Sequence, residues 1–165
     1  MRIFGLAGWS GSGKTTLMEG VLRVLTARGL AVSTIKHAHH AFDVDKPGKD
    51  SFRHRAAGAR EVMLAGGLRW ALMHELGEDA EPTVEDLVAR MQPVDLLLIE
   101  GFKAHAHPKL EVHRPDLGKP PLWPDDPGIV AVASDRPLPG VALPVLDLND
   151  HQAAAAFILE RTGAA

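Results

Sequence analysis

The chain of 165 residues contains no cysteine. Without thiols it can form neither disulfides nor thiolate metal sites, and a cysteine nucleophile is excluded as well. It also lacks an excess of positive charge, because 18 Lys and Arg residues stand against 21 Asp and Glu residues, which gives a formal net charge of −3. No general positive field therefore favours nucleic acid as a partner, and a site for an anion has to be local.

Long apolar runs are missing too. No segment approaches the ~20 apolar residues that cross a bilayer, so we expect no membrane association. The N-terminal residues form an apolar stretch and reach a glycine loop at Gly8, without the charged and apolar regions of an export signal, and we expect a cytoplasmic protein. With 45% apolar and 24% charged residues, a chain of this length is typical of a soluble globular protein, and we predict one domain over residues 1–165.

Strand and helix patterns alternate along the chain. Apolar and β-rich runs predict strands over residues 2–8, 31–37, 68–74, 94–100, 109–114 and 128–134. Helical patterns cover residues 14–28, 50–65, 82–91 and 150–162. Five prolines keep residues 115–128 free of regular structure, so this segment is predicted to be a long surface loop. The alternation predicts a three-layer α/β fold, with a mostly parallel central sheet and helices on both faces.

The residues GWSGSGKT, Gly8 to Thr15, match the pattern G-x-x-x-x-G-K-[ST], with a predicted strand before them and a helix after them. In this motif the backbone N–H groups surround a phosphate, the helix N-terminus adds partial positive charge, and the lysine reaches the outer phosphates. The hydroxyl of Thr15 can bind Mg²⁺. The predicted phosphate-binding residues are Gly11, Ser12, Gly13, Lys14, Thr15 and Thr16. The motif predicts the P-loop NTPase fold and a bound nucleotide.

Glu100 ends the most apolar predicted strand, VDLLLIE. Ligands of open α/β sheets bind at the carboxyl ends of the strands, where a carboxylate can hold Mg²⁺ or orient an attacking group. We expect Glu100 to be a metal residue together with Thr15 and a catalytic residue together with Lys14; a helix cap or a surface ion pair is the alternative. The basic residues that follow can face a second phosphate group or form a plain surface turn. They are Lys103, His105, His107 and Lys109.

Selection of the base has to differ from that of guanine-specific proteins that use [NT]-K-x-D, because none of the seven lysines is followed by Asp two positions later. Ser134 and Asp135 follow a buried predicted strand at its carboxyl end. The carboxylate of Asp135 can accept hydrogen bonds from the edge of guanine. We therefore predict these two residues at the base site, and an ordinary turn at the end of a strand is the alternative.

The segment Thr34 to Arg55 is rich in histidine and in charge. The triplet of His37, His39 and His40 suggests a metal site. We favour another role, because the chain has no cysteine ligand and because a strand would place these imidazoles on alternating sides. The basic and acidic residues of the segment suit a loop that contacts an anionic ligand beside the P-loop. The predicted ligand contacts are His37, Lys49, Asp50 and Arg53. A solvated charged loop is the alternative.

Taken together, GWSGSGKTTL, TIKHAHHAFDVDKPGKDSFRHRAAGA, LLLIEGFK, HPKLEVHR and IVAVASD resemble the molybdopterin-guanine dinucleotide biosynthesis protein B family, MobB, over residues 3–150. The resemblance implies a homodimer that binds GTP with Mg²⁺ and has at most weak GTPase activity. It also implies an accessory role beside the MobA-like enzyme that attaches GMP to molybdopterin, and it admits direct binding of the molybdenum cofactor, as molybdopterin or its guanine dinucleotide.

The leading hypothesis is therefore a Mg²⁺-dependent GTP-binding protein of molybdenum cofactor biosynthesis, with slow hydrolysis because the sequence places no general base and no arginine finger. A small-molecule kinase on the same scaffold is an alternative, although the proline-rich loop lacks the arginines of a kinase lid. A nickel-delivery GTPase would use the histidines as ligands. A non-enzymatic adaptor, in which the nucleotide orders a loop for a partner, remains close to the leading hypothesis.

Overall fold

A computed structural model describes residues 1–38 and 42–164. The chain forms two compact units, one made of Met1–His37 with Met91–Ala165 and the other of Ala38–Arg90. The single domain predicted over residues 1–165 stays a prediction. None of the helices in the described residues has the length and the apolar character that a bilayer span requires.

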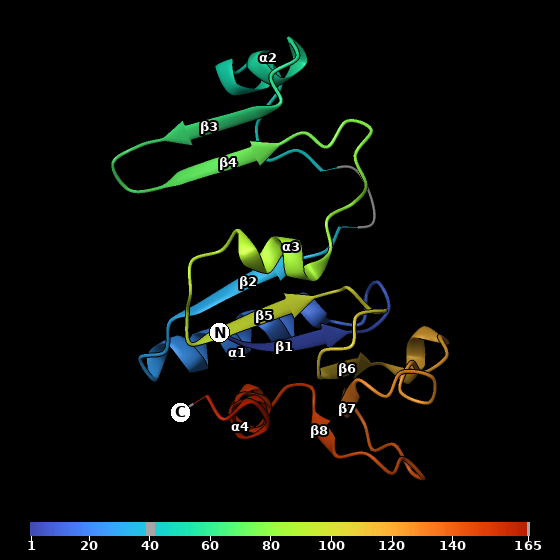
Figure 1. Cartoon of the computed structure of the whole chain (residues 1–165). Coiled ribbons are helices and arrows are strands. Elements are labelled where there is room, and N and C mark those ends of the chain that lie inside the picture. Colours follow the sequence, from blue (N-terminus) through green and yellow to red (C-terminus); the bar gives the residue numbers. More distant parts are fainter. Residues whose placement is uncertain (39–41, 165) are drawn as a thin grey trace. The chain divides into compact units, whose positions relative to one another are not determined.

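A six-stranded sheet forms the centre of the first unit (Figure 1). Its strands are β1 (Arg2–Ala7), β2 (Val32–Lys36), β5 (Leu96–Glu100), β6 (Lys109–His113), β7 (Ile129–Ser134) and β8 (Val145–Asp147). Their order is β2-β5-β1-β6-β7-β8, and every neighbouring pair is parallel. The carboxyl ends of β1, β5, β6 and β7 therefore meet at one edge of the sheet, where open α/β sheets bind ligands.

The sheet is flanked by helices. They are α1 (Lys14–Ala27) and α4 (His151–Thr162), and a short 3₁₀ helix, η1, spans Pro115–Leu117. Helix α1 buries Leu17, Val21 and Leu25, whose four-residue spacing forms one apolar face against the core. Strand β5 is buried along its whole length, as expected for a central strand that is covered on both faces. The α/β class and the parallel sheet are thus confirmed.

The second unit contains α2 (Asp50–Ala56), β3 (Glu61–Ala65), β4 (Trp70–His74) and α3 (Val84–Ala89). Strands β3 and β4 pair with each other in an antiparallel hairpin. Arg55 joins three acidic side chains of this unit, with Nη2–Oδ1 distances of 2.8 Å to Asp43 and 2.6 Å to Asp45, and an Nη1–Oε1 distance of 2.8 Å to Glu75. Hydrogen bonds to these carboxylates raise the pKa of Arg55 and keep its charge fixed.

The structure differs from the sequence prediction at three places. The helix predicted over residues 50–65 ends at Ala56, because Gly58 takes a positive φ of 100° that stops a helix, and β3 follows it. The strand predicted over 68–74 exists as β4, but it pairs with β3 instead of joining the parallel sheet. Strand β8 was not predicted, because three residues are too short to show a period.

Candidate functional site

The P-loop connects the carboxyl end of β1 to the N-terminus of α1. Gly11 and Gly13 have φ values of 80° and 100°, which side-chain-bearing residues rarely adopt. A Cβ at Gly8 would lie 2.5 Å from the carbonyl oxygen of Val112 on β6, so the loop also needs glycine for close packing. Ser12 is 1% exposed, and its contribution to a phosphate site would come from its backbone. The local sequence therefore forms the tight turn that the motif predicts.

Lys14, Thr15, Lys36 and Glu100 form one polar cluster at this edge of the sheet. The hydroxyl of Thr15 donates to Glu100, with Oγ1–Oε1 and Oγ1–Oε2 distances of 3.1 and 3.3 Å. The ammonium group of Lys36, at the end of β2, lies 3.3 Å from Glu100 Oε1 and 3.4 Å from Thr15 Oγ1. Lys14 Nζ donates to the backbone carbonyl of Trp9 at 2.8 Å, so its ammonium group lies across the loop.

Burial and three charged neighbours act on the ammonium group of Lys14. Burial lowers the pKa of Lys14 below its usual value, and the positive charges of Lys103 and Lys36 lower it further, whereas Glu100 opposes the shift. Desolvation disfavours the charged form of an amine. A negatively charged ligand beside Lys14 would favour its charged form and oppose the effect of the two neighbouring lysines.

The same cluster fits a magnesium ion. Hard divalent cations prefer oxygen ligands such as hydroxyl and carboxylate groups. Thr15 Oγ1 and the Glu100 carboxylate converge, and the cationic group of Lys36 already lies within 3.4 Å of both. Glu100 is 8% exposed, so solvent screens its interaction with a cation less than at an exposed position. Residues Thr15 and Glu100, predicted as the metal pair, are thus brought together in the structure.

Ser134 and Asp135 lie at the carboxyl end of β7, on the same edge of the sheet. Ser134 is 3% exposed, and its hydroxyl accepts the backbone N–H of Arg136 at 3.4 Å. Asp135 accepts a hydrogen bond from Arg114, with an Nη1–Oδ2 distance of 2.9 Å. Arg114 also donates from Nε to the carbonyl oxygen of Ser12 at 3.0 Å. Asp135 is therefore connected to the P-loop through one arginine.

His37 directly follows β2, and its ring stacks on Phe102 with 4.5 Å between the ring centroids. Lys49, Asp50 and Arg53 lie in the second unit, around the start of α2. Asp50 and Arg53 form an exposed ion pair of 3.9 Å and line a shallow cavity of about 560 Å³. The ligand contacts predicted for these four residues stay predictions.

The triplet of histidines extends beyond the described part of the chain, since His39 and His40 lie outside it. Within residues 1–38 and 42–164, no group of three or more His, Asp or Glu side chains is placed to hold a metal ion. A nickel site built on the triplet stays a prediction of the alternative hypothesis.

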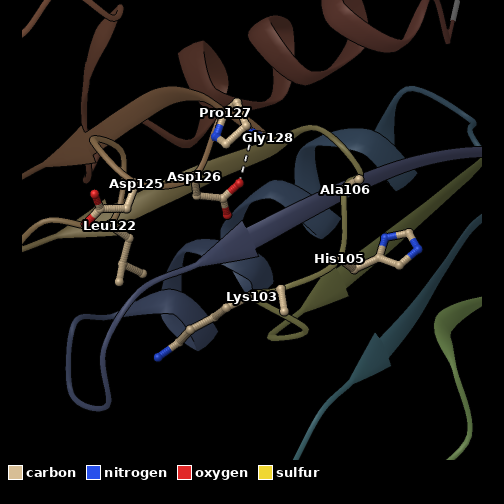
Figure 2. A pocket seen from close by; sticks show the side chains of 9 residues that line it. Lys103, His105, Ala106, Leu122, Asp125, Asp126, Pro127 and Gly128 are labelled. Atoms are coloured by element: carbon tan, nitrogen blue, oxygen red, sulfur yellow. Dashed lines mark hydrogen bonds between the residues drawn. The ribbon is translucent and has the colours of Figure 1, made fainter.

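A cavity of about 700 Å³ opens between residues 103–106 and 122–128 (Figure 2). Lys103 and His105 line it, together with Leu122, Asp125 and Asp126. Two of the basic residues considered for a second phosphate are buried instead. Lys109 is 0% exposed and pairs with Asp126, at an Nζ–Oδ2 distance of 3.0 Å, and His107 is 6% exposed. Only the first two basic residues of this run line the cavity.

Sequence reasoning missed two contacts of the P-loop. Arg114 directly follows β6, so the rule that selected Glu100 and Asp135 from the ends of buried strands would have selected it too. Trp9 donates from Nε1 to the carbonyl oxygen of Pro120 at 2.7 Å, and the Lys103 ammonium lies 4.3 Å from its ring centroid. The proline-rich loop is thereby attached to the P-loop, which no local pattern indicates.

The MobB family, described as molybdopterin guanine dinucleotide synthesis protein B, matches residues 3–135. The chain belongs to the MobB family. It is 42% identical to the molybdopterin-guanine dinucleotide biosynthesis adapter protein of Escherichia coli, over 96% of this chain and 91% of that protein. The adapter protein of Haemophilus influenzae is 43% identical, over 94% and 86% of the two chains.

Solved structures of the family share the fold. The crystal structure of Bacillus subtilis MobB superposes with a TM-score of 0.76 at 26% identity, over 98% of both chains. The MobB homologue from Bacillus stearothermophilus gives a TM-score of 0.73 at 25% identity, over the full length of both chains. Membership of the MobB family places the chain in the biosynthesis of molybdopterin guanine dinucleotide as an adapter protein.

Proposed function

We propose that this MobB-family adapter binds GTP together with Mg²⁺ at its P-loop. The cluster of Lys14, Thr15 and Glu100 carries the proposal, because it joins a phosphate-binding ammonium group to two hard oxygen ligands within 3.3 Å of each other. Ser134 and Asp135 lie at the same edge of the sheet and supply acceptors for the base. These positions support a nucleotide with its phosphates at the P-loop and its base towards β7.

Each residue would have a distinct task. Backbone N–H groups of residues 11–16 would surround the β-phosphate, while Lys14 would neutralise charge on the outer phosphates. Thr15 and Glu100 would hold Mg²⁺, which supplies further neutralisation of the phosphate oxygens. Because Glu100 is already engaged by Thr15 and Lys36, we assign it to the metal side and not to activation of water. Hydrolysis would therefore be slow, well below the ~1 to 100 s⁻¹ of kinases.

A calorimetric titration tests the nucleotide proposal. GTP and ATP are titrated into the protein with and without Mg²⁺, and we expect tighter binding of GTP, strengthened by the metal. Glu100→Gln keeps the shape of the side chain but loses its charge, so the gain in affinity from Mg²⁺ should largely disappear. Glu19→Gln, an exposed glutamate on α1, is the matched control and should behave like the wild type. Equal affinities for GTP and ATP, or a metal response unchanged in Glu100→Gln, would contradict the proposal.

The partner in the pathway is the second part of the proposal. An adapter with slow turnover acts through another protein, and we propose the MobA-like enzyme that transfers GMP to molybdopterin. Adding the chain to a reconstituted transfer assay should raise the yield of the guanine dinucleotide, and the gain should be smaller for Lys14→Ala. If the wild type and Lys14→Ala raise the yield equally, the accessory role does not depend on nucleotide binding at the P-loop. Fast phosphorylation of a small acceptor would instead favour the kinase alternative.

We further propose that the cofactor itself binds in the cavity between residues 103–106 and 122–128. Volumes of about 300 to 1,000 Å³ are typical of small-molecule sites. Asp125 can accept the ring N–H groups of a pterin, and Lys103 can pair with its phosphate. Asp125→Asn and Lys103→Ala should weaken binding of molybdopterin guanine dinucleotide in a titration, whereas Glu160→Gln, at an exposed position of α4, should not. Unchanged affinity in both cavity variants would place the cofactor elsewhere.

A homodimer completes the proposal, with the β3–β4 hairpin as the contact. Two-stranded hairpins are marginally stable alone, and this one exposes large apolar side chains. They are Met63, Leu64, Leu68, Trp70 and Leu72, with exposed fractions of 43 to 95%. A second copy of the chain could pair with the open strand edges and cover this surface. Sedimentation should show a dimer for the wild type and a monomer for Trp70→Glu; a monomeric wild type would contradict this assignment.

A further inference from the structure

One arginine at the end of β6 contacts both the P-loop and the end of β7. Arg114 Nε donates to the backbone carbonyl of Ser12 at 3.0 Å, and Nη1 donates to Asp135 Oδ2 at 2.9 Å. A Cβ built on Gly13 would lie 3.5 Å from both Nε and Nη2 of the same guanidinium. The planar group therefore lies directly against the peptide unit that joins Ser12 to Gly13.

That contact controls the direction of a neighbouring N–H group. In a planar trans peptide the C=O of one residue and the N–H of the next point in opposite directions. By holding the carbonyl oxygen of Ser12, Arg114 keeps the N–H of Gly13 pointing away from the guanidinium. Gly13 has a φ of 100° and lacks a side chain, so its backbone is otherwise free to change orientation. A phosphate in the P-loop needs these N–H groups directed at it.

Asp135 holds Arg114 in place. Its side chain is 20% exposed and forms a charge-assisted hydrogen bond with the arginine, which is stronger and more directional than a neutral one. Arg136 lies near the other carboxylate oxygen, with an Nε–Oδ1 distance of 3.7 Å, and also bonds to Asp116, and neither contact involves the P-loop. Among the described residues, Asp135 Oδ1 is buried and has no hydrogen-bond partner, so the bond through Oδ2 to Arg114 is the one that fixes this side chain.

We propose that Arg114 is a positioning residue for phosphate binding, and that Asp135 acts on the phosphate end of the nucleotide through it. Arg114 orients the Ser12–Gly13 peptide from outside the P-loop and does not itself contact phosphate. This inference rests on the proposed function, because it gives the P-loop a ligand with phosphates. It also gives Asp135 a role that does not depend on reading the base.

The test compares GTP with inorganic triphosphate, which has no base to contact Asp135. Both ligands are titrated calorimetrically into the wild type, Arg114→Ala, Asp135→Asn and the double variant. We expect each single variant to bind triphosphate roughly 10- to 100-fold more weakly, the range of one hydrogen bond to a charged group. The double variant should be little worse than either single variant, because both substitutions break one connection.

Two further variants separate positioning from charge and from folding. Arg114→Lys keeps the positive charge but lacks the planar donors that reach two acceptors at once, so it should restore little of the lost affinity. Arg136→Ala removes a neighbouring arginine that contacts the same carboxylate, and it should bind triphosphate as the wild type does. The amide resonance of Gly13 should shift strongly when triphosphate binds the wild type and only weakly in Arg114→Ala, while thermal midpoints confirm that the variants are folded.

The outcomes are distinct. If the wild type binds neither GTP nor triphosphate, the proposed function fails. If the wild type binds both and Arg114→Ala binds triphosphate equally well, the positioning role alone is overturned. A loss confined to GTP in Asp135→Asn, with triphosphate unaffected, would show that Asp135 reads the base only and would likewise overturn the inference.

Discussion

Replacing Glu111 by alanine should release the proline-rich loop from the sheet. Glu111 is on the central strand β6 and is 0% exposed, yet its carboxylate has no basic partner at hydrogen-bonding distance among the described residues. It instead accepts backbone N–H groups of the loop, at 3.0 Å to both oxygens from Leu122 and at 2.8 Å from Trp123. One buried carboxylate thus fixes two residues of the segment that covers this part of β6.

The size of the effect follows from the two N–H groups. A buried donor left without its acceptor costs about 1 to 3 kcal/mol, which gives about 2 to 6 kcal/mol for both. Removal of a buried charge offsets part of this cost, since burial raises the pKa of Glu111 and so opposes its ionised form. We therefore expect about 2 to 4 kcal/mol of lost stability, or roughly 5 to 15 °C in the thermal midpoint for a chain of this length.

Differential scanning fluorimetry measures the midpoint, and limited proteolysis reports on residues 115–128 directly. Glu111→Ala should expose this segment to cleavage before the rest of the chain unfolds. Glu19→Ala, on the exposed face of α1, is the control and should change stability by less than about 0.5 kcal/mol. A midpoint for Glu111→Ala within 1 to 2 °C of the wild type, roughly the effect of half a kcal/mol, together with unchanged proteolysis, would refute the reasoning.

The pH dependence of the same group gives an independent check. Because the folded pKa of Glu111 is raised above the value of 4.5 for an ordinary glutamate, the folded state binds more protons between these two values. Stability from this group is therefore present below about pH 4.5 and is lost as the pH rises through the folded pKa. Glu111→Gln should lose this part of the pH dependence, and a profile identical to that of the wild type would contradict the assignment.

Three further predictions concern charge. Triphosphate affinity should fall as the pH rises, with a midpoint below the 10.5 of an ordinary lysine because burial lowers the pKa of Lys14; a flat profile up to pH 10.5 would contradict this. Lys36→Met should raise that midpoint, because it removes a positive charge that repels the ammonium group of Lys14, and Glu100→Gln should lower it, because it removes a negative charge that attracts this group. Midpoints equal to that of the wild type would argue against both interactions. Arg55→Lys should speed amide hydrogen exchange in residues 43–75, because lysine lacks the planar guanidinium that binds three carboxylates at once. Unchanged exchange would show that these ion pairs do not stabilise the second unit.

Much of the phosphate site could be predicted from the sequence because its parts are local. The P-loop is a contiguous motif between a strand and a helix, and Glu100 ends an apolar run that could only be a central strand. The rule that ligands bind at the carboxyl ends of parallel strands then brings Glu100 to Thr15, which the structure shows within 3.1 Å. Local pattern and one topological rule were sufficient here.

The second unit shows where this reasoning fails. Residues 50–65 have helical composition throughout, but a helix cannot pass Gly58 at a φ of 100°, and the chain from Glu61 pairs with β4 instead. Nothing in the local composition distinguishes a strand of the parallel sheet from one in a separate hairpin. The pairing partner decides this, and partners are set by tertiary contacts that a single sequence does not display.

The sequence pattern of strand β6 explains why Glu111 escaped prediction. The run KLEVHR alternates charged and apolar residues, which is typical of a strand with one face in water, yet every residue of β6 is buried. Its charged face is covered by the proline-rich loop, whose backbone N–H groups donate to the carboxylate of Glu111. The polar face of the strand is therefore buried. Strand β6 pairs in parallel with β1, so Arg114 leaves β6 beside the P-loop that follows β1. The loop that the sequence marks only as irregular thus explains how a charged strand face becomes buried.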